Sequence, residues 1–137
     1  MSTLTFVFDG YCGFCTRSVA WIERLDRRHR VRMLACQATD VAATHGLTEA
    51  DCNAAAWAFA PDGRVYRGAA AVNAALAAAL GTALPLRIYG LPFVHSVQDA
   101  VYGWIARNRR RFRGVTPWCV AHPEAGCAEA QPSCAIR

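Results

Sequence analysis

The pattern of apolar and polar residues divides the first quarter of the chain into a strand, a helix and a second strand. Residues 3–8 are threonine, leucine, phenylalanine and valine without a charge, which predicts a buried strand. Residues 13–28 carry apolar side chains at the three- and four-residue spacing of one helix face. Residues 31–35 predict a second strand. Because a helix joins them, the two strands should be parallel and form a right-handed βαβ unit.

A hairpin and another helix are predicted for the middle of the chain. Residues 56–60 and 64–67 suit two strands, and the Pro-Asp-Gly sequence between them is a strong turn signal. Residues 69–80 predict an alanine-rich helix that ends at Gly81. Residues 36–55, before the hairpin, suit two short helices broken at Gly46. The order is therefore β-α-β followed by β-β-α, which makes this an α/β chain.

The C-terminal third predicts further helices that pack on the sheet. Residues 82–95 contain two prolines among apolar residues and suit short helical pieces. A longer helix should begin at Ser96, which resembles an N-cap with an acidic residue three positions later, and should run to Phe112. Its apolar stripe is expected to cover part of the sheet. The stripe consists of Val97, Val101, Trp104 and Ile105, joined by Tyr102.

Composition adds bounds on size and compartment. The chain has 137 residues, of which 54% are hydrophobic, enough for one domain with a modest core. We expect this domain to span residues 1–113 and residues 114–137 to form an irregular tail. No apolar run approaches the ~20 residues that cross a bilayer, and the first residues do not resemble a signal peptide. These features predict a cytoplasmic protein without a membrane span.

Charge changes this description little. The net charge is +5, every basic residue other than histidine is arginine, and the arginines concentrate at residues 27–30 and 107–113. Basic residues at the end of a helix complement the negative end of its dipole. No aromatic residues alternate with the first group, so we expect no nucleic-acid partner. In one alternative function, the arginine-rich helix end binds an anionic partner and the cysteines have a structural role.

The candidate chemistry lies where the first strand meets the first helix. Asp9 and a glycine end the strand, and Cys12 and Cys15 open the helix as a Cys-x-x-Cys pair. Unpaired backbone N–H groups at a helix N-terminus favour a thiolate, the reactive form of cysteine. Cys12 should occupy the exposed tip and attack, whereas Cys15 should face the core and resolve the mixed disulfide. Asp9 could cap the helix or relay a proton, although a nearby carboxylate also raises a thiol pKa.

The chain also contains five other cysteines. Cys36 and Cys52 are interpreted as small core residues or incidental thiols. The tail holds Cys119, His122, Cys127 and Cys134, which resemble a metal-ligand set in composition but not in spacing. A loose tail is favoured there over a disulfide or a zinc site. A zinc protein that uses Cys12, Cys15 and tail cysteines remains an alternative function.

Three motifs, in order, resemble the DCC family of predicted thiol–disulfide oxidoreductases. They are Asp9-x-x-Cys12-x-x-Cys15, the hairpin Asp62-Gly63-Arg64-Val65-Tyr66-Arg67-Gly68-Ala69 and the helix segment Tyr102-x-x-Ile105-Ala106-x-Asn108-Arg109.

The resemblance implies a thioredoxin-like fold and dithiol–disulfide exchange with a protein or small-molecule thiol or disulfide. No cofactor is expected, because the electrons travel through the thiols. One departure concerns the cis-proline that thioredoxin-like enzymes usually carry before the hairpin. Residues 53–57 read Asn-Ala-Ala-Ala-Trp, without a proline.

Overall fold

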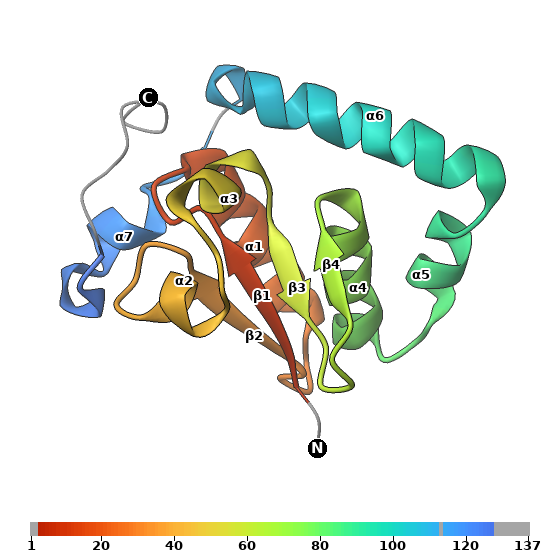
Figure 1. The fold of residues 1–137 in the computed structure, drawn as a ribbon, viewed down its shortest axis with the longest axis horizontal. Coiled ribbons are helices and arrows are strands. Elements are labelled where there is room, and N and C mark those ends of the chain that lie inside the picture. The colour runs from red at the N-terminus through yellow and green to blue at the C-terminus, as the bar shows by residue number, and fades with distance from the viewer. Residues whose placement is uncertain (1–2, 113, 128–137) are drawn as a thin grey trace.

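A four-stranded mixed sheet forms the centre of the computed structural model, which describes residues 3–112 and 114–127 (Figure 1). The strands lie in the order β2-β1-β3-β4. β1 pairs in parallel with β2 and antiparallel with β3, and β3 pairs antiparallel with β4. The strand bounds are β1 Leu4–Phe8, β2 Val31–Ala35, β3 Trp57–Phe59 and β4 Val65–Arg67. This sheet is consistent with the predicted thioredoxin-like core.

The helices also follow the predicted order. α1 joins β1 to β2, two short helices precede the hairpin, and α4 follows it. Their bounds are α1 Gly13–Leu25, α2 Val41–Thr44, α3 Glu49–Ala54, α4 Ala69–Leu80, α5 Leu84–Tyr89 and α6 Pro92–Asn108, with the 3₁₀ helix η1 Arg109–Arg111, then α7 Trp118–Ala121 and the 3₁₀ helix η2 Pro123–Ala125. The last two elements lie in the predicted irregular tail.

Alternate residues of β1 point into two cores, as the two-residue period of a strand requires. Phe6 and Phe8 pack on one face against Val19 and Ile22 of α1 and the buried alanines of α4. Val7 faces the other side, where a smaller cluster also contains Cys36, Val41 and Cys52. β1 is thus covered on both faces, and the cysteine motif begins where this buried strand ends.

The start of α6 differs from the prediction. The helix begins at Pro92, with Leu91 as its N-cap, and Ser96 lies inside it. Proline at the first helical position has the required backbone angle and lacks only an N–H that would be unpaired there. The Ser96 hydroxyl donates to the Pro92 carbonyl at 3.4 Å and caps nothing. The Ser-x-x-Asp pattern was therefore a false capping signal.

The predicted apolar stripe of α6 is also corrected. Val97, Val101 and Trp104 are 61%, 51% and 53% exposed, so they do not cover the sheet. Tyr102 and Ile105, the other two residues of the predicted set, do face the interior, where they line a cavity. In Figure 1, α6 spans the top of the view, across one end of the domain. All five residues belong to one broad apolar band of the helix, so periodicity alone could not decide which edge of the band faces inward.

The C-terminal segment is ordered against the cysteine motif where it is described. Val115 N donates to Gly13 O at 3.2 Å, and Cys119 N donates to Gly10 O at 2.9 Å. Cys119 forms a disulfide with Cys127, which corrects the expectation of a loose tail with free thiols. The predicted boundary at residue 113 thus separates two parts that are hydrogen-bonded to each other. Cys134 lies outside the described residues.

Within the described ranges, 3–112 and 114–127, no helix is long and apolar enough to cross a membrane.

Candidate active site

Cys12 is the N-cap of α1, so its sulfur lies at the helix N-terminus that the sequence predicted. Its Sγ accepts a hydrogen bond from the Cys15 backbone N–H at 3.3 Å. Cys12 is only 8% exposed, however, and the expectation of an exposed tip is wrong. The C-terminal segment packs closely against the motif here. A methyl group on neighbouring Gly13 would lie 2.5 Å from the carbonyl oxygen of Val115, so only glycine leaves room for this contact.

The pKa values of the two thiols of the motif are shifted in opposite directions. The pKa of Cys12 is lowered from its ordinary 9.0 to about 7, first by a hydrogen bond from the Cys15 side chain. The Cys15 backbone N–H and the Arg109 guanidinium lower this pKa further, against burial and the negative charge of Asp9. The pKa of Cys15 is raised well above its ordinary value, because its thiol donates to Cys12 and is buried. Cys12 is thus suited to be the thiolate and Cys15 the thiol.

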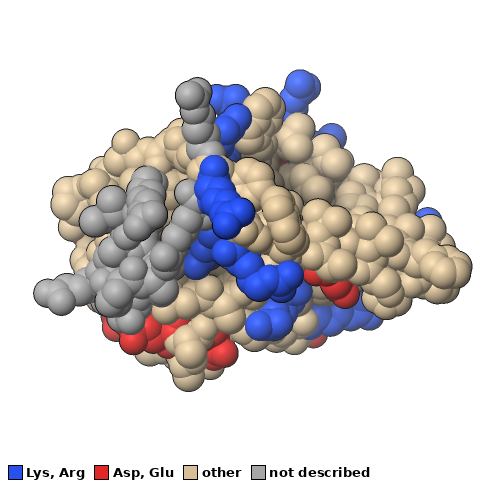
Figure 2. All heavy atoms as spheres, turned by 90° about the horizontal axis from the view of Figure 1, so that it is seen from above, with Lys and Arg blue, Asp and Glu red and all other residues tan. Residues whose placement is uncertain are grey.

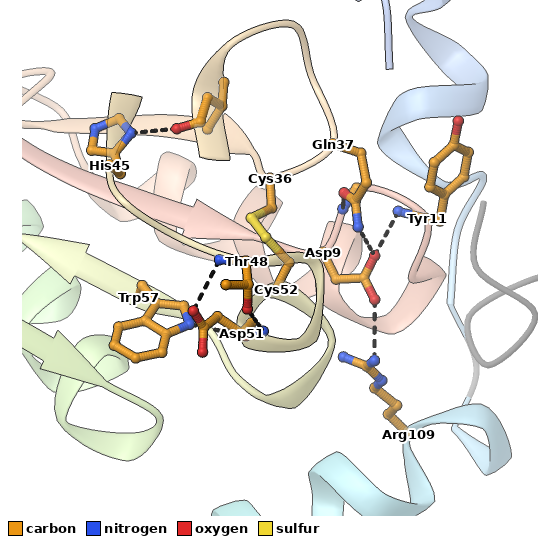
Figure 3. Close-up of a disulfide and its surroundings, with 12 residues drawn as sticks. Asp9, Tyr11, Cys36, Gln37, His45, Thr48, Asp51, Cys52, Trp57 and Arg109 are labelled. Carbon is orange, nitrogen blue, oxygen red and sulfur yellow. Dashed lines mark hydrogen bonds and ion pairs between the residues drawn. A yellow bond between two sulfur atoms is a disulfide. The ribbon is translucent and has the colours of Figure 1, made fainter. Parts of the chain in front are cut away.

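Asp9 is held by three donors and does not cap the helix. Its Oδ1 accepts hydrogen bonds from the Tyr11 N–H and from Gln37 Nε2, both at 3.0 Å. Its Oδ2 forms an ion pair with Arg109 Nη2 at 3.1 Å, and its side chain is only 1% exposed (Figure 3). A carboxylate this deeply buried requires such partners. Of the two roles suggested by the sequence, helix capping is excluded because Cys12 is the N-cap.

Arg109 is the site residue that pattern reasoning missed. It lies just after α6, yet its Nη1 donates to Cys15 Sγ at 3.7 Å and its Nη2 donates to Asn53 O at 3.2 Å. The run of arginines at this helix end suggested dipole capping and solvation. The one signal that included Arg109 was the family-like motif of residues 102–109. No local pattern indicates which arginine of such a run turns inward.

A second disulfide supports this ion pair, and it corrects the interpretation of its cysteines as incidental thiols. Cys36 and Cys52 are bonded to each other across 16 positions of sequence. The residue after Cys36 is Gln37, which binds Asp9 and also accepts a hydrogen bond from the Gly10 N–H at 2.8 Å. The residue after Cys52 is Asn53, which binds Arg109. The disulfide therefore joins the two segments that hold the ion pair (Figure 3).

An apolar cavity of about 240 Å³ lies beside Cys15. Its polar boundary includes the Tyr102 hydroxyl, which accepts a hydrogen bond from the Ala56 N–H at 3.0 Å. Burial is the main cause that raises the pKa of Tyr102, so this phenol stays protonated near neutral pH. The walls come from β1, α1, the segment before β3, α4 and α6. They consist of Phe6, Phe8, Asp9, Phe14, Cys15, Ser18, Val19, Ile22, Ala55, Ala56, Val72, Tyr102, Ile105 and Arg109.

The cysteines and histidines that the structure describes are not arranged as a metal site. Among residues 3–112 and 114–127, no three histidine, cysteine or acidic side chains are placed to hold a metal ion. Cys119 and Cys127 are bonded to each other, and a disulfide sulfur is not a thiolate ligand. The described residues therefore do not form a zinc site from Cys12, Cys15 and these tail cysteines.

Arginine side chains form a band across the face seen from above in Figure 2. Arg107 and Arg111 are exposed, whereas Arg109 is engaged with Asp9 and Cys15. The absence of a nucleic-acid partner stays a prediction. The cytoplasmic location also stays a prediction, and two disulfides are more typical of oxidising compartments.

Together, the fold and the site define a class. A strand and turn place two cysteines at a helix N-terminus beside a mixed β2-β1-β3-β4 sheet, as in thioredoxin-like dithiol proteins. A family model described as DCC1-like thiol-disulfide oxidoreductase matches residues 6–115, and the chain belongs to this family. Membership confirms the resemblance seen in the motifs and indicates thiol–disulfide redox activity. The chain has no significant match among curated proteins or among solved structures.

Proposed function

We propose that this protein is a dithiol–disulfide oxidoreductase in which Cys12 attacks a substrate disulfide and Cys15 resolves the mixed disulfide. The observation that carries the proposal is the split between the two thiols. Cys12 has a pKa of about 7 at a helix N-terminus, and Cys15 has a raised pKa next to it. A thiol that is half ionised near neutral pH combines thiolate abundance with nucleophilicity.

The reaction consists of two exchanges. The Cys12 thiolate attacks one sulfur of the substrate, the substrate S–S bond breaks, and the first product leaves as a thiolate that takes a proton from solvent. Cys15 then loses its proton to solvent and attacks the Cys12 sulfur. The bond between Cys12 and the substrate sulfur breaks, the second product leaves as a thiolate that takes a proton from solvent, and the Cys12–Cys15 disulfide closes. Two electrons pass from the protein to the substrate, and an external dithiol restores the reduced protein.

Arg109 and Asp9 act on the second step in this proposal. The guanidinium lies 3.7 Å from Cys15 Sγ, so its positive charge favours the Cys15 thiolate that must form before resolution. Asp9 fixes the guanidinium through the 3.1 Å ion pair. Asp9 is therefore a positioning residue here. The rate–pH profile of Asp9→Asn tests whether Asp9 also relays a proton.

The test is to trap the intermediate. Cys15→Ser lacks the resolving thiol, so it should accumulate a mixed disulfide at Cys12 when mixed with a disulfide such as bis(2-hydroxyethyl) disulfide. Cys12→Ser should accumulate none under the same conditions, as peptide mass mapping would show. Equal trapping in both variants would reject the ordered roles. No trapping in Cys15→Ser, with no reduction by the unmodified protein, would reject the function.

A further inference from the structure

We propose that the cavity beside Cys15 binds an apolar group, about the size of one substituted aromatic ring, of a low-molecular-weight disulfide substrate. This inference rests on the proposed dithiol–disulfide exchange and names the class of substrate. The large apolar side chains of its wall come from β1, α1, α4 and α6, elements far apart in the sequence. An apolar pocket with a few converging polar groups is the usual form of a small-molecule site.

The charges at the cavity favour a neutral occupant. Asp9 and Arg109 are the two charged residues of the lining, and they form an ion pair with each other at 3.1 Å. The Tyr102 hydroxyl already accepts from Ala56 N, and the Ser18 hydroxyl donates to Phe14 O at 3.0 Å. An ionised group in this space would lose its hydration without gaining a counter-ion of its own.

The volume limits the size of the occupant. An apolar cavity of about 150 Å³ in another protein stays dry and takes up benzene. The cavity described above has about 240 Å³, which leaves room for a ring with a short linker to a sulfur atom. A bulky peptide or a folded protein domain would not fit inside it.

The position of the cavity connects this group to the chemistry. Cys15 forms part of the wall, and its backbone N–H and thiol both hydrogen-bond the Cys12 sulfur. A ring held in the cavity therefore brings the sulfur attached to it next to the reacting pair. The positive Arg109 side chain, 3.7 Å from Cys15 Sγ, lies at the same place and favours the thiolate that leaves.

Two contacts argue for a small molecule over an extended peptide. A bound peptide strand needs free backbone N–H and C=O groups beside the cysteines. Here the Ala56 N–H is already bonded to Tyr102, and the Gly13 carbonyl between the cysteines is bonded to Val115 N. Cys12 itself is 8% exposed. A low-molecular-weight disulfide avoids the need for these backbone partners.

The experiment compares two substrates under single-turnover conditions. Reduced protein, freed of external thiol, is mixed with dibenzyl disulfide or with bis(2-hydroxyethyl) disulfide, and the released thiol is measured. Both release alkanethiols, so the ring is the main difference. We expect dibenzyl disulfide to react at least about tenfold faster per mole of substrate, since apolar pockets discriminate on this scale.

Two variants fill the cavity from two different helices, so that one failure to fold does not end the test. Ser18→Leu adds bulk from α1, and Val72→Phe adds a ring from α4. In both, the ratio of the two rates should fall toward one. Val65→Phe is the matched control, because it makes the same substitution at a position of β4 that is 55% exposed. It should keep the ratio of the unmodified protein.

Binding is measured separately from activity with toluene as the probe. Calorimetric titration should show toluene binding to the unmodified protein and to Val65→Phe, and none to Val72→Phe. Equal rates for the two disulfides, or a ratio that the filling variants leave unchanged, would overturn the cavity assignment while leaving the exchange reaction intact. Faster reduction of insulin than of dibenzyl disulfide would overturn the small-molecule class. No reduction of any disulfide would overturn the proposed function itself.

Discussion

Replacing Arg109 by glutamine tests the link between the ion pair and the reactivity of Cys12. Arg109 is 15% exposed in its side chain and contacts Asp9, Cys15 and Asn53. Its charge is one of the causes that lower the Cys12 pKa to about 7, after the hydrogen bonds from Cys15. Glutamine keeps a polar side chain but removes that charge, so the Cys12 pKa should rise toward its ordinary 9.0.

The direction and size of the kinetic effect follow from the titration. Near pH 7, about half of Cys12 is thiolate in the unmodified protein, and only the thiolate is alkylated. If the pKa rises by one unit, about a tenth remains ionised, so alkylation near pH 7 slows about fivefold. Well above the new pKa the two proteins should react alike. Asp9→Asn should shift the profile the opposite way, because the Asp9 charge raises the Cys12 pKa.

The same substitution should also destabilise the fold. It leaves the Asp9 carboxylate, 1% exposed, without its cation. Breaking a buried ion pair from one side costs about 3–5 kcal/mol, and the hydrogen bonds from Tyr11 and Gln37 that remain favour the lower end. The double variant Asp9→Asn with Arg109→Gln removes both charges of this pair, so it should recover much of this loss.

The assay is the rate of iodoacetamide alkylation of Cys12 against pH, with the labelled peptide identified by mass spectrometry. Urea unfolding gives the free energy of unfolding of the same samples. Arg107→Gln is the matched control, because it removes an exposed arginine from the same helix. If Arg109→Gln keeps a midpoint near 7 and unfolds like this control, the ion pair neither tunes Cys12 nor stabilises the site.

Three other predictions concern the surroundings of the site. Replacing both Cys36 and Cys52 by alanine should lower the free energy of unfolding by about 3 kcal/mol for a loop of this length, and should raise the midpoint of the motif's alkylation profile; an unchanged midpoint would show that the disulfide does not hold the ion pair. Gly10→Ala should destabilise by about 1–3 kcal/mol, because its methyl group would lie 2.6 Å from Cys119 Sγ; an equally stable variant in urea would contradict that packing. Val97→Ser, on the exposed stripe of α6, should change the free energy of unfolding by no more than about 0.5 kcal/mol, and a loss of several kcal/mol would mean that this stripe is covered.

The sequence determined the elements whose patterns are local. The charge-free run of residues 4–8 predicted β1, the Pro-Asp-Gly turn predicted the hairpin, and the alanine-rich run between Gly68 and Gly81 predicted α4. The Cys-x-x-Cys pair after a strand placed both thiols at the start of α1. These predictions succeeded because strand period, turn chemistry and helix termination act between residues close together in the chain.

Only the tertiary structure decided which distant residues meet. Arg109 lies 100 positions from Asp9 in the sequence, yet the two form an ion pair. Gln37 and Asn53, which hydrogen-bond this pair, each follow a cysteine of the Cys36–Cys52 disulfide. The inward face of α6 is the one whose Tyr102 accepts a hydrogen bond from Ala56 N. Val97 and Val101 fit the same helical period as the inward residues, yet they are exposed. The low exposure of Cys12 accompanies a C-terminal segment that returns to Gly13. Each of these contacts depends on how the chain packs, and the pattern of apolar residues near a side chain does not specify its partner across the fold.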